Sequence, residues 1–232
     1  MIDTILFDLD GTLLPMNQDD FMTAYFEEVA KKFVPQGYDK DELIQAIWSG
    51  TKSMIQNDGK KTNREVFWLE FGAIMGEEKL KDEKYFDEFY TKEFNNVKRK
   101  VKDDGISGIL VKELKEKNYK LILATSPLFP LVAVETRLRW IGLEPEDFSY
   151  ITSYENCRYC KPGADYYREI IKNTGITAEN SIMVGNNVDE DMTAAETGME
   201  TFLVTSFIEN KNDKDISAFK HGTLIDFREY IL

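Results

Sequence analysis

The apolar positions of this chain follow two different spacings. Between residues 16 and 100 they recur at helical intervals, as in Phe21, Tyr25, Val29 and Phe33, which lie four residues apart. Three further groups in this segment have comparable spacing: Leu43, Ile47 and Trp48; Phe67, Leu69, Phe71 and Ile74; and Phe86, Phe89, Tyr90 and Phe94. The pattern predicts a small unit of helices packed on a shared apolar core, to which we assign Trp48 and Trp68.

Short apolar runs alternate with helical patterns in the remainder of the chain. The runs predict strands at residues 4–8, 121–124, 151–152, 181–184 and 201–204, and helical patterns occur at 109–114, 131–140, 166–171 and 192–197. Strands that alternate with helices form a parallel sheet with helices on both faces. The predicted fold class is therefore α/β, with a doubly wound, Rossmann-like parallel sheet.

The helical unit interrupts this alternation directly after the first strand. Because the strand at 4–8 must join the sheet, the unit is predicted to be an insertion. Residues 1–15 and 101–232 then form the α/β core, and residues 16–100 form the inserted helical unit. We expect hinges between the two near residues 14–16 and 101–103, and a solvated loop at 209–215 (ENKNDKD).

Composition narrows the classes of partner. The chain has 232 residues and a net charge of −13, which argues against nucleic acid as the main partner because that needs a basic surface. No apolar run approaches the roughly 20 residues of a membrane helix, and the N-terminus lacks the pattern of a secretory signal. We expect a cytoplasmic protein that acts on a small molecule, and the sequence does not indicate its oligomeric state.

Two carboxylates follow the first predicted strand. Asp8 and Asp10 are two residues apart, so an extended chain points both the same way, past the strand's end, and Gly11 then allows a sharp turn. Ligands of open α/β sheets bind at that end of the strands. One acid of such a pair can attack an electrophile while the other transfers a proton. An isolated pair of this kind is more often a solvated acidic turn.

The complete string ILFDLDGTLL, residues 5–14, resembles the first signature of the haloacid dehalogenase-like hydrolase superfamily, in the DxDGT form typical of its phosphatases. The resemblance implies that Asp8 is the nucleophile and forms an aspartyl-phosphate. It implies that Asp10 protonates the leaving oxygen, then activates water, and that its backbone carbonyl binds Mg²⁺. Three partial matches follow in the order that this family has.

Two of these matches supply candidate phosphate ligands. Thr125 ends the strand at 121–124, and its hydroxyl, together with the Ser126 amide, is expected to hold a phosphoryl oxygen. Lys161 matches the lysine of the third motif, where its ammonium would neutralise charge as the phosphoryl group is transferred. Without the first motif, a threonine at a strand end and an isolated lysine would both be ordinary surface features.

The fourth match departs from the family pattern at one position. Residues 183–191 (MVGNNVDED) place Asn186 where the family usually has its first acid and Asp191 at the second. The implied Mg²⁺ site would hold Asp8, the Asp10 carbonyl and Asn186, with Asp191 bound directly or through water. An asparagine carbonyl is a suitable hard ligand but carries no charge, so we expect weaker binding of Mg²⁺.

The inserted unit matches, in position, the α-helical C1-type cap of the superfamily. Such a cap closes over the site and contacts the leaving group. We expect a polar loop at residues 49–53 (SGTKS), between two cap helices, from which Lys52 reaches the leaving group; the alternative is a solvated lysine.

The cysteines form the pair Cys157 and Cys160 beside Lys161. Their spacing matches redox and half-zinc motifs, but the chain has no other cysteine and one histidine, His221, which disfavours a zinc site. We consider a redox role a minor alternative.

Together the motifs predict Mg²⁺-dependent hydrolysis of a small phosphomonoester. Two alternatives remain open: a phosphomutase of the same superfamily, and a catalytically weak member that acts as a binding protein because of Asn186.

Overall fold

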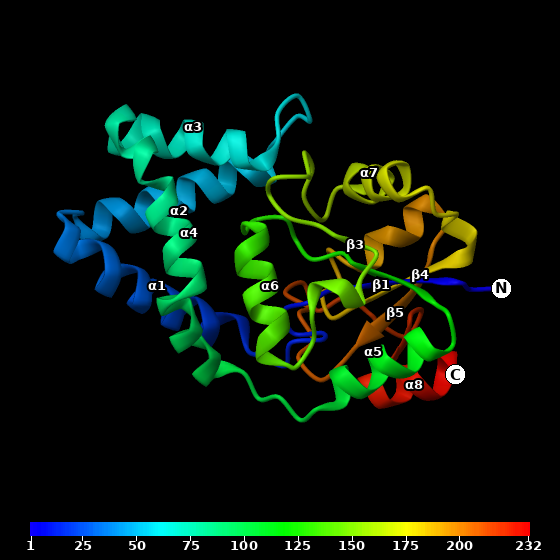
Figure 1. Cartoon of the computed structure of the whole chain (residues 1–232). Coiled ribbons are helices and arrows are strands. Elements are labelled where there is room, and N and C mark those ends of the chain that lie inside the picture. The colour runs from blue at the N-terminus through cyan, green and yellow to red at the C-terminus, as the bar shows by residue number, and fades with distance from the viewer.

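A six-stranded parallel sheet forms the core of the molecule and lies against a group of helices (Figure 1). The computed structural model describes residues 1–232. The strands are β1 (Thr4–Phe7), β2 (Lys120–Leu123), β3 (Tyr150–Ile151), β4 (Ser181–Gly185), β5 (Glu200–Val204) and β6 (Lys220–Gly222). Their order across the sheet is β3-β2-β1-β4-β5-β6, and every neighbouring pair is parallel. The predicted α/β fold class is confirmed.

β1 lies in the middle of this sheet, which explains its uninterrupted apolar run. It pairs with β2 on one side and with β4 on the other, so that Thr4 is opposite both Lys120 and Ser181. All four residues of β1 are buried, as expected for a strand covered on both faces.

Helices cover both faces of the sheet. Ile5 and Phe7 belong to the same hydrophobic cluster as residues of α5 (Ile106–Glu116) and α8 (Leu224–Ile231). Leu6 belongs to a second cluster, with residues of α7 (Ala164–Thr174) and the short 3-10 helix η6 (Met192–Thr197). The alternation of β1 side chains between two clusters is the doubly wound arrangement that the pattern predicts.

The helical insert lies between β1 and β2 in the sequence. It comprises α1 (Gln18–Phe33), η1 (Val34–Gln36), α2 (Lys40–Ile55), α3 (Asn63–Met75), η2 (Glu77–Asp82), α4 (Glu83–Thr91) and η3 (Glu93–Lys100). All four groups of apolar residues fall on these helices, although Phe94 lies on a 3-10 helix after α4. The two chain connections to the core run side by side, because the Lys102 amide donates to the Pro15 carbonyl at 2.9 Å. The predicted boundaries between core and insert, at residues 15/16 and 100/101, stay a prediction.

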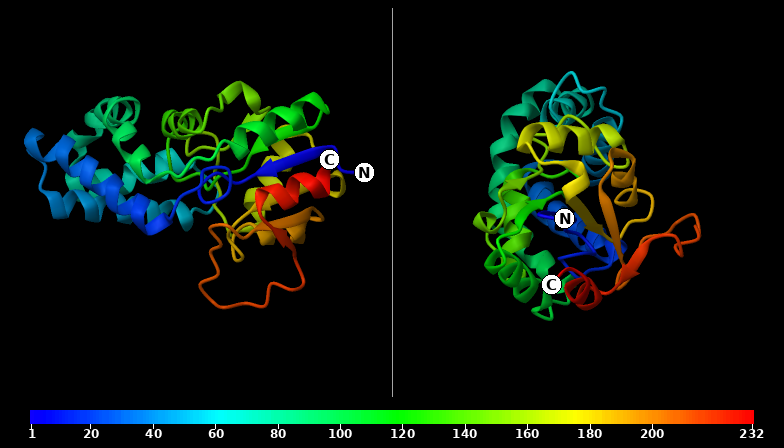
Figure 2. Two further views of the ribbon diagram at one scale, coloured as in Figure 1. Left: turned by 90° about the horizontal axis from the view of Figure 1, so that it is seen from below. Right: turned by 90° about the vertical axis from the view of Figure 1, so that its right-hand side faces the viewer.

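The insert lies at the carboxyl ends of the strands. Figures 1 and 2 show β1 running from the N-terminus toward the insert, with α6 (Leu131–Trp140) between the insert and the sheet. The Thr136 hydroxyl of α6 donates to the Tyr90 carbonyl at 3.1 Å, and Trp140 Nε1 donates to Asn95 Oδ1 at 2.9 Å. One hydrophobic cluster of 40 buried residues continues from the sheet into the insert. The helical unit is therefore packed firmly over this edge of the sheet.

Two expectations about the helical insert are wrong. Residues 49–53 form no loop, because they lie within α2, where Gly50 allows close packing on the ring of Phe67. Trp48 is not a core residue, since half of it is exposed. The helical pattern predicted at 192–197 is confirmed, and the segment forms a 3-10 helix.

Other parts of the chain were not predicted. β6 and α8 at the C-terminal end have short or polar patterns that the apolar spacing does not mark. The 3-10 helices η4 (Pro145–Asp147) and η5 (Ala178–Asn180) complete the fold. No helix of the structure has the length and apolar character needed to cross a membrane.

Candidate active site

A buried ion chain lies at the carboxyl edge of the sheet. Asp8 follows β1, and its Oδ1 accepts a hydrogen bond from Lys161 Nζ at 2.8 Å. The same ammonium donates to Asp191 Oδ1 at 2.6 Å. All three side chains are nearly inaccessible to solvent. The structure thus brings residues from three distant motifs into one contact, as the convergence of parallel strand ends requires.

The charge of Lys161 depends on its two carboxylate partners. Burial lowers the pKa of this ammonium, but the carboxylates of Asp191 and Asp8 oppose that effect and hold the pKa well above its usual value. Lys161 is therefore a fixed positive charge beside Asp8, where an incoming phosphoryl group would add negative charge.

Asn186 is held on both sides of its amide. Its Nδ2 donates to the Phe207 carbonyl at 2.6 Å, so its Oδ1 points back and accepts from the Thr12 hydroxyl at 3.0 Å. The same hydroxyl lies 3.1 Å from Asp8 Oδ2 and can donate to either oxygen. This arrangement gives a structural reason for asparagine here, because an aspartate would place a carboxylate oxygen against the Phe207 carbonyl.

Gly11 permits this approach of Asn186 to the first motif. Its φ is +82°, and an added Cβ would lie only 2.3 Å from Asn186 Nδ2. Both the backbone conformation and the contact exclude a side chain at this turn.

Asp10 has a partner that the sequence did not indicate. Its Oδ2 forms an ion pair with Arg137 Nη1, and the Arg137 side chain is completely buried in α6. The Arg137 guanidinium lies over the ring of Phe129, with its central carbon 4.6 Å from the ring centroid. Asp10 Oδ1 and Arg137 Nη2 are both buried without a hydrogen-bond partner. Burial raises the pKa of the Asp10 carboxyl, and the Arg137 charge partly opposes that shift.

Three backbone amides in the turns after β1 and β2 have no acceptor within the chain. The backbone amides of Leu9, Asp10 and Ser126 donate no hydrogen bond within the chain. Thr125 is buried, and its carbonyl accepts from the hydroxyls of Thr152 and Tyr166 at 2.7 and 2.8 Å, which fixes the loop after β2. The turns that follow β1 and β2 at this edge of the sheet therefore keep free N–H groups.

The remaining acids of the fourth motif are arranged differently. Asp191 Oδ2 accepts from the Asn187 amide at 2.9 Å, so both of its oxygens have partners. Burial raises the pKa of Glu190 to about 7, while Asp189 forms a surface ion pair with Lys214.

No three His, Cys, Asp or Glu side chains in the chain are grouped as a metal site. Besides the carboxylates, the oxygens that a cation could use here include Asn186 Oδ1 and the Asp10 carbonyl.

Lys52 and the cysteines lie apart from these contacts. Two cavities lie beside the insert: one is lined mainly by residues of the insert, many of them aromatic, and the other mainly by the loop of residues 205–211. Lys52 is an exposed residue of α2 that lines neither of them, so the geometry gives no support to a contact with the leaving group. Cys157 and Cys160 are both free and buried. Burial raises the pKa of the Cys160 thiol to about 12 and that of Cys157 further, which disfavours redox chemistry at either residue.

Sequence reasoning missed two polar residues at this edge. Thr12 belongs to the DxDGT string, so its hydroxyl could have been included from the motif alone. Arg137 gives no local signal, because its partner lies 127 residues earlier in the chain.

Comparisons with known proteins match nearly the whole chain. The family model described as haloacid dehalogenase-like hydrolase matches residues 5–226. The pyrophosphatase PpaX of Bacillus cereus is 22% identical over 97% of this chain and 92% of its own length. The glyceraldehyde 3-phosphate phosphatase of Methanocaldococcus jannaschii is 29% identical over 88% of this chain and 85% of its own length.

Solved structures share the whole fold. A HAD phosphatase from Thermococcus onnurineus has a TM-score of 0.59 and 19% identity, covering 99% of this chain and 97% of that one. The HAD-hydrolase YfnB from Bacillus subtilis, in a structure bound to magnesium, has a TM-score of 0.55 and 19% identity over 99% and 98% of the two chains.

Proposed function

Because the chain belongs to the haloacid dehalogenase-like hydrolases, we propose that it hydrolyses a small phosphomonoester through an aspartyl-phosphate on Asp8. The observation that carries the proposal is the contact of Asp8 with buried Lys161, at an edge where the amides of Leu9, Asp10 and Ser126 are unused. A nucleophilic carboxylate, a fixed cation and free N–H donors are what phosphoryl transfer needs. The distant relatives named above are a pyrophosphatase and a glyceraldehyde 3-phosphate phosphatase, and both names agree with hydrolysis at phosphorus.

In the first step an Asp8 oxygen attacks phosphorus, and the bond from phosphorus to the leaving oxygen breaks. Asp10 gives its proton to that oxygen. In the second step Asp10 takes a proton from water, the water oxygen attacks phosphorus, and the bond to Asp8 breaks. Lys161 and the free amides hold the phosphoryl oxygens, with Thr125 supplying its hydroxyl. Arg137 holds Asp10 Oδ2 and so orients Oδ1 for both proton transfers.

The oxygen ligands present fit Mg²⁺, which prefers hard ligands. Asp8 Oδ2 and Asn186 Oδ1 lie within 3.1 Å of the same hydroxyl, and the Asp10 carbonyl accepts no hydrogen bond. These three oxygens would hold the ion, and Asp191 would act through Lys161 or through water. When bound, Mg²⁺ would neutralise negative charge on the phosphoryl group. The single carboxylate among the three supports the expectation of weak binding.

The test is phosphate release from a panel of phosphorylated metabolites and simple phosphate esters, with and without millimolar Mg²⁺, beside Asp8→Asn. We expect Mg²⁺-dependent release that the substitution abolishes. Transfer of the phosphoryl group to a second hydroxyl would instead favour a phosphomutase. Inactivity on all members would favour a binding protein.

A further inference from the structure

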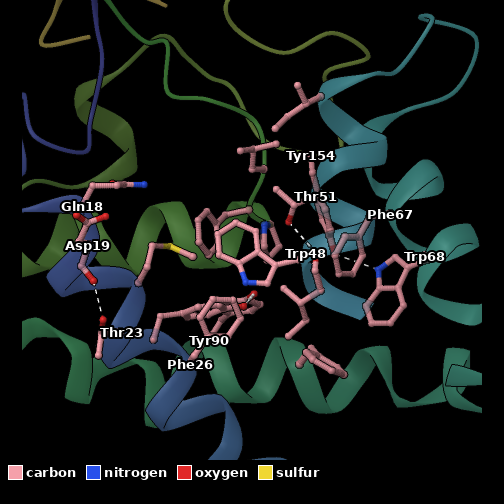
Figure 3. Close-up of a pocket in the computed structure, with 18 of the residues that line it drawn as sticks. Gln18, Asp19, Thr23, Phe26, Trp48, Thr51, Phe67, Trp68, Tyr90 and Tyr154 are labelled. Atoms are coloured by element: carbon pink, nitrogen blue, oxygen red, sulfur yellow. Dashed lines mark hydrogen bonds between the residues drawn. The ribbon is translucent and has the colours of Figure 1, made fainter. Parts of the chain in front are cut away.

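A large aromatic cavity lies between the helical insert and the loops at the carboxyl edge of the sheet (Figure 3). Its volume is about 580 Å³, and 13 of its 19 lining residues are hydrophobic. A cavity of this size and composition is typical of a site for a small organic molecule. It exceeds what a phosphate or a three-carbon sugar leaving group would fill.

Most polar atoms of the lining side chains already have partners, although Trp48 Nε1 forms no hydrogen bond. The hydroxyls of Tyr25 and Tyr90 lie 2.9 Å apart and bond to each other. Trp68 Nε1 donates to the Tyr154 hydroxyl at 3.4 Å. The hydroxyl of Thr51 donates to a carbonyl of its own helix. The interior therefore offers few free groups for the hydroxyls of a sugar or the charges of a second phosphate.

The amide and carboxylate side chains of Gln18 and Asp19 lie at one end of the cavity. Figure 3 shows Gln18 and Asp19 at that end and Trp68 at the other, with Trp48 between them. Trp48 is half exposed and packs on Phe26, with ring centroids 5.4 Å apart. An indole exposed inside an apolar hollow is a surface that an apolar ligand would cover.

The polar end adjoins the proposed catalytic edge. Gln18, Asp19 and Lys211 also line a second cavity of about 480 Å³, whose wall is the loop of residues 205–211. The carbonyl of Phe207 in that loop holds Asn186. This loop belongs to the orange segment that extends from the core between β5 and β6 (Figure 2, left).

A second connection runs through the loop after β2. Leu128, Phe129 and Pro130 line the aromatic cavity, and Leu128 follows Ser126 by two residues. Two residues span at most about 7 Å. A phosphoryl group held by the Ser126 amide would thus have its leaving group within reach of the aromatic cavity.

We propose that this cavity binds the leaving group, and that the substrates are phosphomonoesters of an apolar alcohol with an aromatic ring or a chain of comparable size. The inference rests on the proposed function, because the phosphoryl group must occupy the edge beside Asp8. Burial of apolar groups then discriminates between substrates, and each buried methylene should raise kcat/KM by about threefold to fourfold.

The turnover test compares alkyl phosphates whose leaving oxygens are chemically alike: 3-phenylpropyl, n-propyl and glycerol phosphate. We expect kcat/KM for the phenylpropyl ester to exceed that for the propyl ester by about tenfold or more, as burial of a phenyl ring predicts, and glycerol phosphate to be the poorest of the three. Trp48→Ala and Ile55→Glu should each reduce the phenylpropyl to propyl ratio by about tenfold. Leu69→Ala, which changes an equally exposed residue outside the cavity, should leave the ratio unchanged.

A binding test separates this inference from the proposed function. The non-hydrolysable analogues 4-phenylbutylphosphonate and butylphosphonate replace the ester oxygen by carbon, and calorimetry gives their affinities for the unmodified chain. We expect the phenyl compound to bind about tenfold or more tightly, and Trp48→Ala to remove the difference.

The outcomes distinguish the two proposals. Hydrolysis of all esters with equal phosphonate affinities, or with glycerol phosphate preferred, would overturn the inference and leave the phosphatase proposal standing. Absence of hydrolysis together with selective phosphonate binding would overturn the phosphatase proposal and support the cavity as the site for the apolar group of an anionic ligand.

Discussion

The polar edge of the sheet and the aromatic cavity of the insert meet at residues 126–130, yet they are built in opposite ways. At the edge, Lys161 joins Asp8 to Asp191, and Asn186 is fixed through both ends of its amide. In the cavity, the hydroxyls of Tyr25 and Tyr90 bond to each other, and most of the lining residues are hydrophobic.

This difference assigns the reaction to the polar edge and the choice of leaving group to the aromatic cavity. A charged network out of contact with water allows one position for each group, so any substitution there should affect turnover and stability together. An apolar cavity tolerates exchange of side chains of similar volume. Substitution in the cavity should therefore change which leaving group is accepted while the reaction remains the same.

The largest effect should come from Lys161→Met. The substitution leaves Asp8 and Asp191 buried without their shared cation, which costs about 3–5 kcal/mol of the free energy of unfolding. We expect phosphate release to fall at least about 100-fold, because the charge beside the phosphoryl group is lost. Denaturant unfolding and phosphate release measure the two effects. Adding Asp191→Asn should recover part of the stability but not the activity; unchanged stability in Lys161→Met would contradict the described network.

A somewhat smaller effect is expected for Arg137→Met. If Arg137 positions Asp10 for proton transfer, alkyl phosphates should lose about 100-fold in kcat, a typical contribution of an acid catalyst. The kcat for p-nitrophenyl phosphate should fall much less, since its leaving group needs no proton. Arg137→Lys retains the charge and should restore part of the alkyl activity. Equal losses for both substrates would indicate a structural role only.

Asn186→Asp tests the departure from the family pattern. Without Mg²⁺, the new carboxylate would face the Phe207 carbonyl in place of a 2.6 Å hydrogen bond. We expect the free energy of unfolding to fall by about 1–3 kcal/mol, with part of the loss recovered on adding Mg²⁺. Thermal unfolding at several Mg²⁺ concentrations measures this. A variant as stable as the parent without Mg²⁺ would contradict the described role of the Asn186 amide. Far higher activity of the variant with Mg²⁺ would agree with weak Mg²⁺ binding at Asn186.

The smallest effect should come from Lys52→Ala. This residue is exposed on α2 and lines neither cavity. We expect kcat/KM to stay within about twofold, as for most surface substitutions. A tenfold loss on any substrate in the panel would restore the sequence-based role of Lys52 at the leaving group.

The sequence predicted the core better than the insert. β1 is an uninterrupted apolar run because it is buried on both faces, and its carboxylates follow at the sheet's edge. β6 has no such run, because it is a three-residue strand at the border of the sheet. Ile47 and Trp48 are neighbours on α2, but only Ile47 is buried, since adjacent helical residues point about 100° apart.

Prediction of the candidate active site from the sequence is limited in the same way. The contact between Asp8 and Lys161 could be expected because each residue lies in a short local motif of one family, whereas their roles stay predictions. The Arg137 pair and the aromatic cavity could not, because each depends on how α6 and the insert pack on the core. Spacing within one helix carries no information about a partner 127 residues away.

The most direct test of the account is to trap the phosphorylated intermediate. The protein would be mixed with a substrate that it hydrolyses, quenched in acid within a turnover, digested and analysed by mass spectrometry. We predict a phosphoryl group on Asp8 and none in Asp8→Asn. Phosphate release without any phosphorylated Asp8, or a phosphoryl group on another residue, would contradict the account.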